Sequence, residues 1–178
     1  ASSVARGQSF TLTANSAADA NGTIARVDFY RDANKNGVAD AGELIGSDAN
    51  ATGGFTLSVA VPATDALGTQ AYLAVAVDND GGLSAFRSTS VTMTNAVPTI
   101  AGLTPSVATL ENGDPLTLTA NSVVDIDGTI SKVSFYADTN KNGVADAGEL
   151  LGSDSDSIGG FSYSLTSAQT FALPSTTV

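Results

Sequence analysis

Two short acidic stretches carry the side chains of this sequence that are best suited to chemistry. The first runs from Asp32 to Glu43 and reads Asp-Ala-Asn-Lys-Asn-Gly-Val-Ala-Asp-Ala-Gly-Glu. Side-chain oxygens stand at its positions 1, 3, 5, 9 and 12, which are Asp32, Asn34, Asn36, Asp40 and Glu43. Hard oxygen donors in this number suit Ca²⁺, whereas Mg²⁺ prefers a tighter octahedron and keeps more of its water.

The spacing matches the twelve-residue calcium loop of EF-hands at every fixed position. Gly37 at position 6 permits a sharp turn, and Val38 at position 7 would offer its main-chain carbonyl. Asp40 would bind directly or through water, and Glu43 would bind with both carboxylate oxygens. The stretch therefore predicts a calcium site, although a polar hairpin loop with acids facing solvent gives a similar pattern.

The same loop occurs again from Asp138 to Glu149 and differs only by Thr139 in place of Ala33. Its expected ligands are Asp138, Asn140, Asn142, Val144, Asp146 and Glu149. The two copies have diverged elsewhere, which argues against a very recent duplication. Two copies that keep every ligand position favour calcium over a plain polar turn.

Composition excludes several classes of function. The 178 residues carry a net charge of −11, which disfavours nucleic acids and anionic membrane surfaces as partners. The absence of cysteine excludes thiolate zinc sites and cysteine nucleophiles, and the absence of histidine removes the usual general base. No apolar stretch is long enough to span a bilayer. We therefore expect no enzymatic activity and no membrane insertion.

The chain contains an internal repeat. Aligning Asp32 with Asp138 gives an offset of 138 − 32 = 106 residues, which also aligns residues 10–16 with 116–122 without a gap. About 106 residues is the usual size of a two-sheet β-sandwich. We therefore expect two domains, residues 1–95 and 96–178, joined by a short linker at residues 95–98.

Period-two alternation of apolar residues predicts strands, and no helical periodicity of useful length occurs. In the first copy the expected strands are residues 10–14, 24–30, 44–45, 55–61, 71–77 and 91–93, and residues 97–103 would open the second copy. Val27 and Phe29 are expected to face inward, with Arg26 and Asp28 outward. Residues 78–82 read as a hairpin turn.

Both terminal domains are expected to be incomplete. In the repeat alignment, residue 1 matches residue 107 and residue 178 matches residue 72, so the first copy lacks an opening strand and the second its last strands. A sandwich without these strands exposes its core and an open sheet edge. The residues are either a window on a longer array of repeats or acceptors of strands from a neighbouring chain.

Several short motifs point to a known family, and they occupy residues 12–14, 19–30, 44–48 and 74–82, and 118–120, 125–136 and 150–154 in the second copy. In these residues the sequence resembles the bacterial Ig-like repeats of large surface proteins, which are also appended to secreted polysaccharide enzymes. It implies an all-β fold of tandem Ig-like antiparallel β-sandwiches with Greek-key connections. It also implies an extracellular location at the bacterial cell surface. Residues 65–72 further resemble the tyrosine corner of such sandwiches.

The sequence departs from these repeats in one place, where the calcium loop replaces a short hairpin. The flanking helices of a true EF-hand are absent, so the loop cannot open an apolar groove as calcium sensors do. A structural ion is therefore expected instead of a switch.

These features predict calcium-stiffened spacer repeats of an adhesin, fibre or surface layer, with neighbouring repeats and other copies of the chain as partners. The alternative is an accessory or carbohydrate-binding module of a secreted enzyme, for which exposed aromatic side chains are the usual contacts. The aromatic residues available for such contacts are Tyr30, Phe86 and Tyr136. Four other acids are turn formers or further ligands, namely Asp78, Asp80, Asp125 and Asp127.

Overall fold

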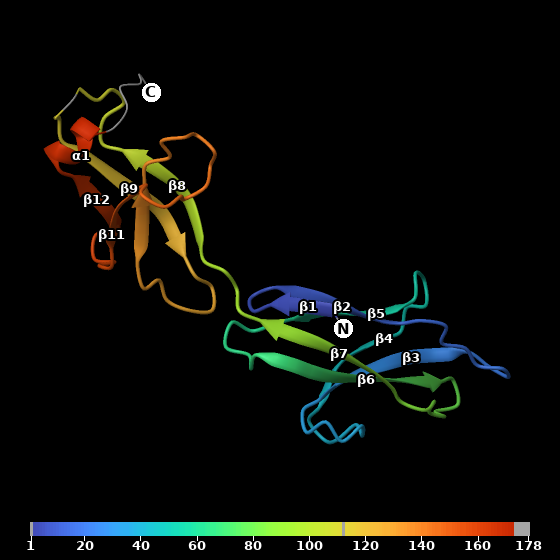
Figure 1. The fold of residues 1–178 in the computed structure, drawn as a ribbon. Coiled ribbons are helices and arrows are strands. Elements are labelled where there is room, and N and C mark those ends of the chain that lie inside the picture. The colour runs from blue at the N-terminus through green and yellow to red at the C-terminus, as the bar shows by residue number, and fades with distance from the viewer. Residues whose placement is uncertain (1, 112, 173–178) are drawn as a thin grey trace. The chain divides into compact units, whose positions relative to one another are not determined.

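A computed structural model describes residues 2–111 and 113–172 of the chain (Figure 1). Within these ranges the chain forms twelve β-strands and one short helix, which confirms the predicted all-β class. It divides into two compact units, Ala1–Ala96 and Val97–Val178, one residue after the boundary expected from the linker. None of the described helices is long and apolar enough to cross a membrane.

The first unit consists of two sheets. Its strands are β1 (Ser2–Ala5), β2 (Ser9–Ala14), β3 (Ile24–Asp32), β4 (Leu44–Asp48), β5 (Phe55–Ala60), β6 (Gly68–Asp78) and β7 (Arg87–Thr94). Five of them form one sheet in the order β1-β7-β6-β3-β4, and β2 pairs with β5 in the other (Figure 1). All pairs are antiparallel except β1 with β7. Strand β1 was not predicted, because its short segment has no apolar alternation and becomes a strand only by pairing with β7.

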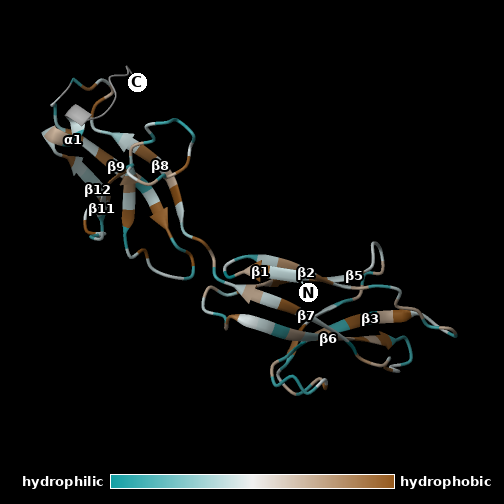
Figure 2. Cartoon of the chain, in the orientation of Figure 1, coloured by the Kyte–Doolittle hydropathy of each residue, from teal (hydrophilic) through white to brown (hydrophobic). Residues whose placement is uncertain are grey.

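The core of this unit lies between the two sheets, and apolar and polar residues alternate along the strands that enclose it (Figure 2). Its buried residues are Leu12, Val27, Phe29, Phe55, Val61, Tyr72, Val91 and Met93. The inward positions predicted for Val27 and Phe29 are therefore confirmed, and the predicted strands 10–14 and 55–61 contribute Leu12, Phe55 and Val61 to the same core. Tyr72, predicted as a tyrosine corner, packs edge-to-face on Phe10 with ring centroids 5.4 Å apart.

Asp28 lies on the outer face of β3, opposite to the core residues Val27 and Phe29, as predicted, but it is buried there. Only 6% of its surface is exposed. Arg26 donates two hydrogen bonds to the carboxylate, at 2.8 and 3.1 Å, and the Ser47 hydroxyl donates another at 2.5 Å. Burial raises the pKa of Asp28, but the bonds from Arg26 and Ser47 and the charge of Arg26 outweigh it, so the pKa is lowered.

This carboxylate predicts an acid-sensitive contribution to stability. A lowered pKa in the folded state stabilises the fold above the unfolded value of about 3.9, and the contribution disappears as pH falls through the folded value. Because half of the Arg26 side chain is exposed, we expect Asp28→Asn to cost about 1 kcal/mol at pH near 7. The cost should shrink as pH falls below the unfolded value of about 3.9 and through the lowered folded-state pKa of Asp28, as measured by urea unfolding at neutral pH and at several acidic pH values. An equal loss at every pH would contradict this assignment.

The second unit repeats part of this arrangement. Its elements are β8 (Thr99–Pro105), β9 (Leu116–Val124), β10 (Val133–Tyr136), β11 (Leu150–Asp154), β12 (Phe161–Leu165) and α1 (Ser167–Ala172). The sheet order is β12-β9-β8 in one sheet, and β10 pairs with β11 in another. Phe161 lies opposite Ala120, as Phe55 lies opposite Ala14, so the strand register repeats with the offset of 106 residues. The buried core residues are Ala120, Val133, Phe135 and Phe161.

Helix α1 was not predicted. The main-chain N–H of Gln169 donates to the Thr166 hydroxyl at 3.3 Å, and the Thr166 N–H donates to the Gln169 side-chain oxygen at 2.9 Å. This reciprocal pair is a capping box, which satisfies two main-chain donors at the start of a helix. The equivalent segment of the first unit contains Pro62 and forms a turn. The capping pair in the second unit and Pro62 in the first therefore distinguish these two equivalent segments.

Candidate functional site: two acidic loops between paired strands

Each acidic loop joins two neighbouring antiparallel strands. Residues 32–43 lead from β3 to β4, and residues 138–149 lead from β10 to β11. The Arg31 N–H donates to the Glu43 carbonyl at 2.8 Å, and the Ala137 N–H donates to the Glu149 carbonyl at 2.9 Å. These bonds hold the two ends of each loop beside each other, where the loop joins the two paired strands.

Position 1 of each loop folds the chain back by accepting main-chain donors. The two carboxylate oxygens of Asp32 accept the N–H groups of Asn36 at 3.0 Å and Gly37 at 2.9 Å. Asp138 accepts the corresponding N–H groups of Asn142 and Gly143 at the same two distances. Asp32 is buried whereas Asp138 is exposed, because β6 pairs with the end of β3 beside Asp32.

The side chains at positions 3 and 5 both bond to one carboxylate oxygen of the acid at position 9. The side-chain amides of Asn34 and Asn36 donate to the same oxygen of Asp40, at 2.7 and 2.9 Å. In the second loop the amides of Asn140 and Asn142 donate to Asp146 at 2.8 and 2.7 Å. These two amide bonds lower the pKa of Asp146, because they stabilise its ionised form.

Position 12 closes the loop through both of its oxygens. Glu43 accepts the N–H groups of Ala33 at 2.8 Å and Asp40 at 3.0 Å. Glu149 accepts the equivalent N–H groups of Thr139 at 2.8 Å and Asp146 at 3.1 Å. The Asp146 N–H and then the Thr139 hydroxyl lower the pKa of Glu149. Thr139, the one residue that differs between the loops, thus adds a hydrogen bond at 2.9 Å that sequence reasoning missed.

The backbone of both loops is held in an uncommon conformation. Lys35 and Lys141 have φ values of 59° and 61°, and the glycines two residues later have 76° and 73°. A non-glycine residue in this left-handed region costs about 1–2 kcal/mol. Both loops adopt it at the same two positions, so the hydrogen bonds of the acids and amides enforce one loop shape.

A turn at the end of each loop directs the chain into a strand. The Glu43 N–H donates to the Asp40 carbonyl at 3.2 Å, and Gly42 has a φ of 89°. Positive φ at the third residue defines a type II turn, for which glycine is the favoured residue. In the second loop the Glu149 N–H donates to the Asp146 carbonyl at the same distance. This geometry replaces the helix that would follow a true EF-hand loop.

In each loop the side chains predicted as ligands at positions 3, 5 and 9 bond to one another, whereas those at positions 1 and 12 accept main-chain N–H groups of the same loop. Val38 and Val144 contribute only main-chain atoms, and their side chains are about half exposed, at 51% and 57%. An ionised carboxylate has about four lone-pair sites, so each of these acids keeps acceptor capacity beyond its bonds within the loop. Across residues 2–111 and 113–172, no three His, Cys, Asp or Glu side chains form a metal-binding group by themselves. A cation here would therefore need the amide and main-chain oxygens as well.

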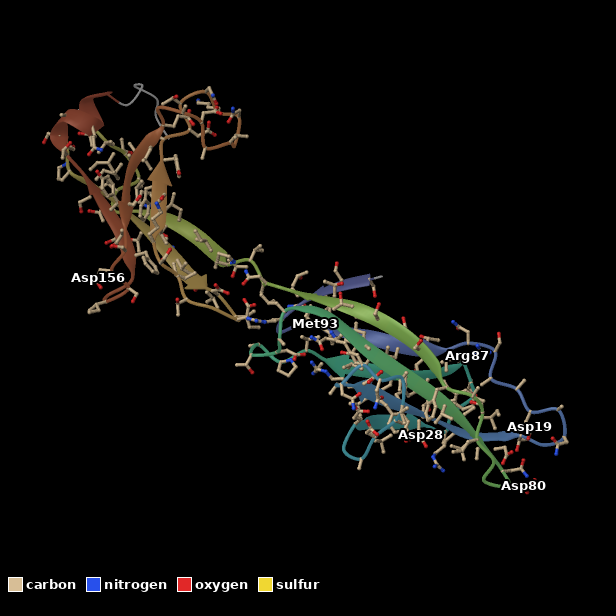
Figure 3. The ribbon with its side chains drawn as sticks, turned by 60° about the horizontal axis from the view of Figure 1, so that its bottom comes forward. Asp19, Asp28, Asp80, Arg87, Met93 and Asp156 are labelled. Atoms are coloured by element: carbon tan, nitrogen blue, oxygen red, sulfur yellow. The ribbon has the colours of Figure 1, made fainter. Side chains whose placement is uncertain are left out.

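The other acids considered as ligands form turns. Asp78 accepts the N–H groups of Asp80 at 2.9 Å and Gly82 at 2.7 Å. Asp125 accepts the N–H of Asp127 at 3.3 Å. Asp19 and Asp80 lie at the same end of the first unit, where the Thr23 N–H donates to the Asn79 side chain at 2.9 Å (Figure 3). These bonds favour the turn-forming interpretation for this group of acids.

Comparisons with known proteins give similarity at the level of structure. The sequence matches no family model and no curated protein. Twenty-three chains of solved structures match it. One belongs to the fibronectin(III)-like modules of CbhA from Clostridium thermocellum, with 28% sequence identity and a TM-score of 0.39. That match covers 52% of this chain and 87% of the other.

Proposed function

We propose that residues 32–43 and 138–149 each bind one Ca²⁺ ion and thereby stiffen tandem Ig-like repeats. The observation that carries this proposal is the hydrogen-bond pattern of the acids and amides, which is the same in both loops although Asp32 is buried and Asp138 is exposed. Because the surroundings of the two loops differ, their common shape comes from interactions within each loop.

The donor set fits calcium better than a smaller or softer cation. Each loop offers three carboxylates, two amide oxygens and one main-chain carbonyl, all of them hard oxygen ligands. In the first loop these are Asp32, Asn34, Asn36, Val38, Asp40 and Glu43. Their equivalents in the second are Asp138, Asn140, Asn142, Val144, Asp146 and Glu149. A bound cation would offset the mutual repulsion of three carboxylates within one loop.

The proposed role is mechanical. Each loop ends on a strand at both sides, so ligand groups fixed by an ion would make a rigid corner between two paired strands. No helix pair is present at these loops to open or close. This supports a structural spacer in a bacterial extracellular adhesin, fibre or surface layer, whose partners are neighbouring repeats and other copies of the chain.

The expected affinity fits an extracellular environment. Three carboxylates per loop are fewer than the tightest intracellular sites use, so we expect a Kd of about 10⁻⁴ to 10⁻³ M. Such sites would fill at extracellular calcium levels.

Calcium titration of the chain tests this proposal. Isothermal calorimetry should detect two sites per chain in that affinity range, and Mg²⁺ at the same concentrations should bind weakly, because it tolerates fewer protein ligands. Absence of saturable calcium binding up to about 10 mM, well above the expected Kd, would remove the proposal.

An accessory or carbohydrate-binding module is the second candidate. Tyr30 and Phe86 pack edge-to-face with ring centroids 6.2 Å apart, and Phe86 is 39% exposed. Tyr136 is 42% exposed. Exposed aromatics are typical contacts for sugar rings, but Phe10, Phe29, Phe55 and Phe161 are directed into the cores. A catalytic domain in the same gene would favour this candidate, whereas many further repeats would favour the spacer.

A further inference from the structure

An asparagine is followed directly by a glycine at positions 5 and 6 of each acidic loop, Asn36 before Gly37 and Asn142 before Gly143. All four residues are exposed. The loop shape requires the glycines, whose φ values of 76° and 73° lie in the left-handed region. Because glycine has no Cβ, its main-chain nitrogen is open to a close approach by the preceding side chain. Such a pair permits attack of that nitrogen on the asparagine side-chain carbonyl.

Hydrogen bonds within the loop act on both partners of this attack. The Val38 N–H donates to the Asn36 side-chain oxygen at 2.8 Å, and the Val144 N–H donates to the Asn142 side-chain oxygen at 2.7 Å. That oxygen gains negative charge as its carbon is attacked, so a donor already placed on it stabilises the transition state. The N–H of the glycine in each loop donates to the carboxylate at position 1 at 2.9 Å, which holds the attacking nitrogen in place.

Other asparagines of the first unit share only one of these two features. The Asn34 side-chain oxygen also accepts a main-chain N–H, that of Asn36 at 3.0 Å, but Lys35 follows it. Asn21 precedes Gly22, but within residues 2–111 and 113–172 its side chain takes part in no hydrogen bond. The pairs at positions 5 and 6 combine the exposed nitrogen with the polarised carbonyl.

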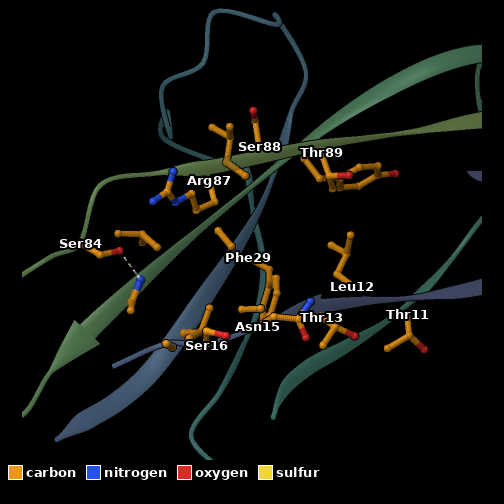
Figure 4. Close-up of a pocket in the computed structure, with 18 of the residues that line it drawn as sticks. Thr11, Leu12, Thr13, Asn15, Ser16, Phe29, Ser84, Arg87, Ser88 and Thr89 are labelled. Carbon is orange, nitrogen blue, oxygen red and sulfur yellow. Dashed lines mark hydrogen bonds between the residues drawn. The ribbon is translucent and has the colours of Figure 1, made fainter. Parts of the chain in front are cut away.

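A left-handed residue after an asparagine is not sufficient by itself. Asn15 and Ser16 both line the cavity between the two sheets of the first unit (Figure 4). Ser16 has a φ of 57°, close to the 59° of Lys35. In both places the following residue carries a side chain that shields its nitrogen, so Asn15 serves as a further comparison for the loops.

We propose that Asn36 and Asn142 are sites of spontaneous deamidation through a succinimide. A bond forms between the main-chain nitrogen of the glycine and the side-chain carbonyl carbon of the asparagine, and the bond from that carbon to the side-chain nitrogen breaks. The proton lost by the glycine nitrogen is taken up by the departing nitrogen, which leaves as ammonia. A water molecule from the solvent then opens the ring at either carbonyl and gives aspartate or isoaspartate.

The two products would change the proposed calcium sites in opposite directions, and this consequence rests on the proposed function. Aspartate at position 5 gives each loop a fourth carboxylate, and ligand charge is one determinant of calcium affinity. Isoaspartate adds a methylene group to the main chain between positions 5 and 6, which displaces the glycine from its turn. The deamidation itself is measured in calcium chelator, so its result does not depend on calcium binding.

Incubation of the whole chain in chelator at mildly alkaline pH, followed by peptide mass spectrometry, tests the proposal. We expect Asn36 and Asn142 to deamidate at least about tenfold faster than Asn21, because a donor on a developing oxyanion contributes that much or more. Asn34 and Asn15 should stay unmodified over the same period. In heavy-oxygen water each product should gain one heavy oxygen as ammonia is released. Equal rates at Asn36 and Asn21 would contradict the role of the loop, and unmodified Asn36 and Asn142 would overturn the proposal.

Two variants of the first loop change the reactive pair. Lys35→Gly places a glycine after Asn34 at a φ of 59° that suits glycine, so Asn34 should begin to deamidate. Gly37→Asn adds a side chain that shields the nitrogen, and should slow the reaction at Asn36 toward the rate at Asn34. The loop has room for it, since an added Cβ at Gly37 meets nothing within 4 Å and asparagine adopts left-handed φ values.

The second loop is unchanged in both variants and provides the internal control. Asn142 should react there at its wild-type rate, which separates a local effect from unfolding of the chain. An unmodified Asn34 in Lys35→Gly, or an undiminished rate at Asn36 in Gly37→Asn, would count against the succinimide route and the proposal with it.

Discussion

Replacing Gly152 by alanine is expected to lower the free energy of unfolding by about 3 kcal/mol, near the upper end for overpacked sites. A Cβ atom at this position would overlap the ring of Tyr163 and lie 2.8 Å from its hydroxyl. The ring cannot easily move, because it stacks on Phe135 at 6.0 Å and the Gln169 side-chain amide donates to its hydroxyl at 3.1 Å. Chemical denaturation of the wild-type and variant chains measures the difference.

The first unit supplies the matched control. Gly46 is the equivalent of Gly152, and its added Cβ would meet the flexible Leu57 side chain at 2.7 Å. Leu57 is in turn the equivalent of Tyr163, so Gly46→Ala should cost about 1 kcal/mol, near the lower end for overpacking. Adding Tyr163→Leu to Gly152→Ala should recover much of the lost stability. A double variant as unstable as Gly152→Ala alone would show that the clash with the ring is not the cause.

The second large effect is the calcium-dependent part of the stability. At a hundredfold excess over its Kd, a ligand that binds only the folded state stabilises it by about 2.7 kcal/mol. We expect Glu43→Gln to remove this stabilisation from the first unit, since the amide replaces an anionic ligand. Glu149→Gln should remove the calcium-dependent shift from the second unit only. Amide hydrogen exchange with calcium and with chelator, followed separately on peptides of each unit, gives the two effects.

The control for charge is Glu111→Gln, which removes one acid that lies outside both loops. It should leave the calcium-dependent protection of both units unchanged. Protection that is indifferent to calcium in the wild-type chain would refute the proposed sites, whereas an equal loss in all three variants would indicate a non-specific effect of net charge.

Local sequence was sufficient for strands such as β2 and β5 and for the position of the two loops. Residues 10–14 and 55–61 alternate with period two, and both became strands with the expected faces, because burial of one face of a pleated strand requires this pattern. The two loops could be located because their acids, amides and glycines act within twelve residues. That they bind Ca²⁺ remains a prediction from the chemistry of their oxygens.

Contacts between distant residues decided what the sequence could not show. Asp28 looks like a solvent-facing acid, yet it is buried because Ser47 on β4 and Arg26 enclose it. Strand β1 exists only through its pairing with β7. By itself the sequence determined the alternation of apolar residues, the internal repeat and the spacing of the predicted ligands, because each of these follows from the order of the residues alone. The tertiary structure alone decided burial and sheet order, because each depends on which strands meet across the fold.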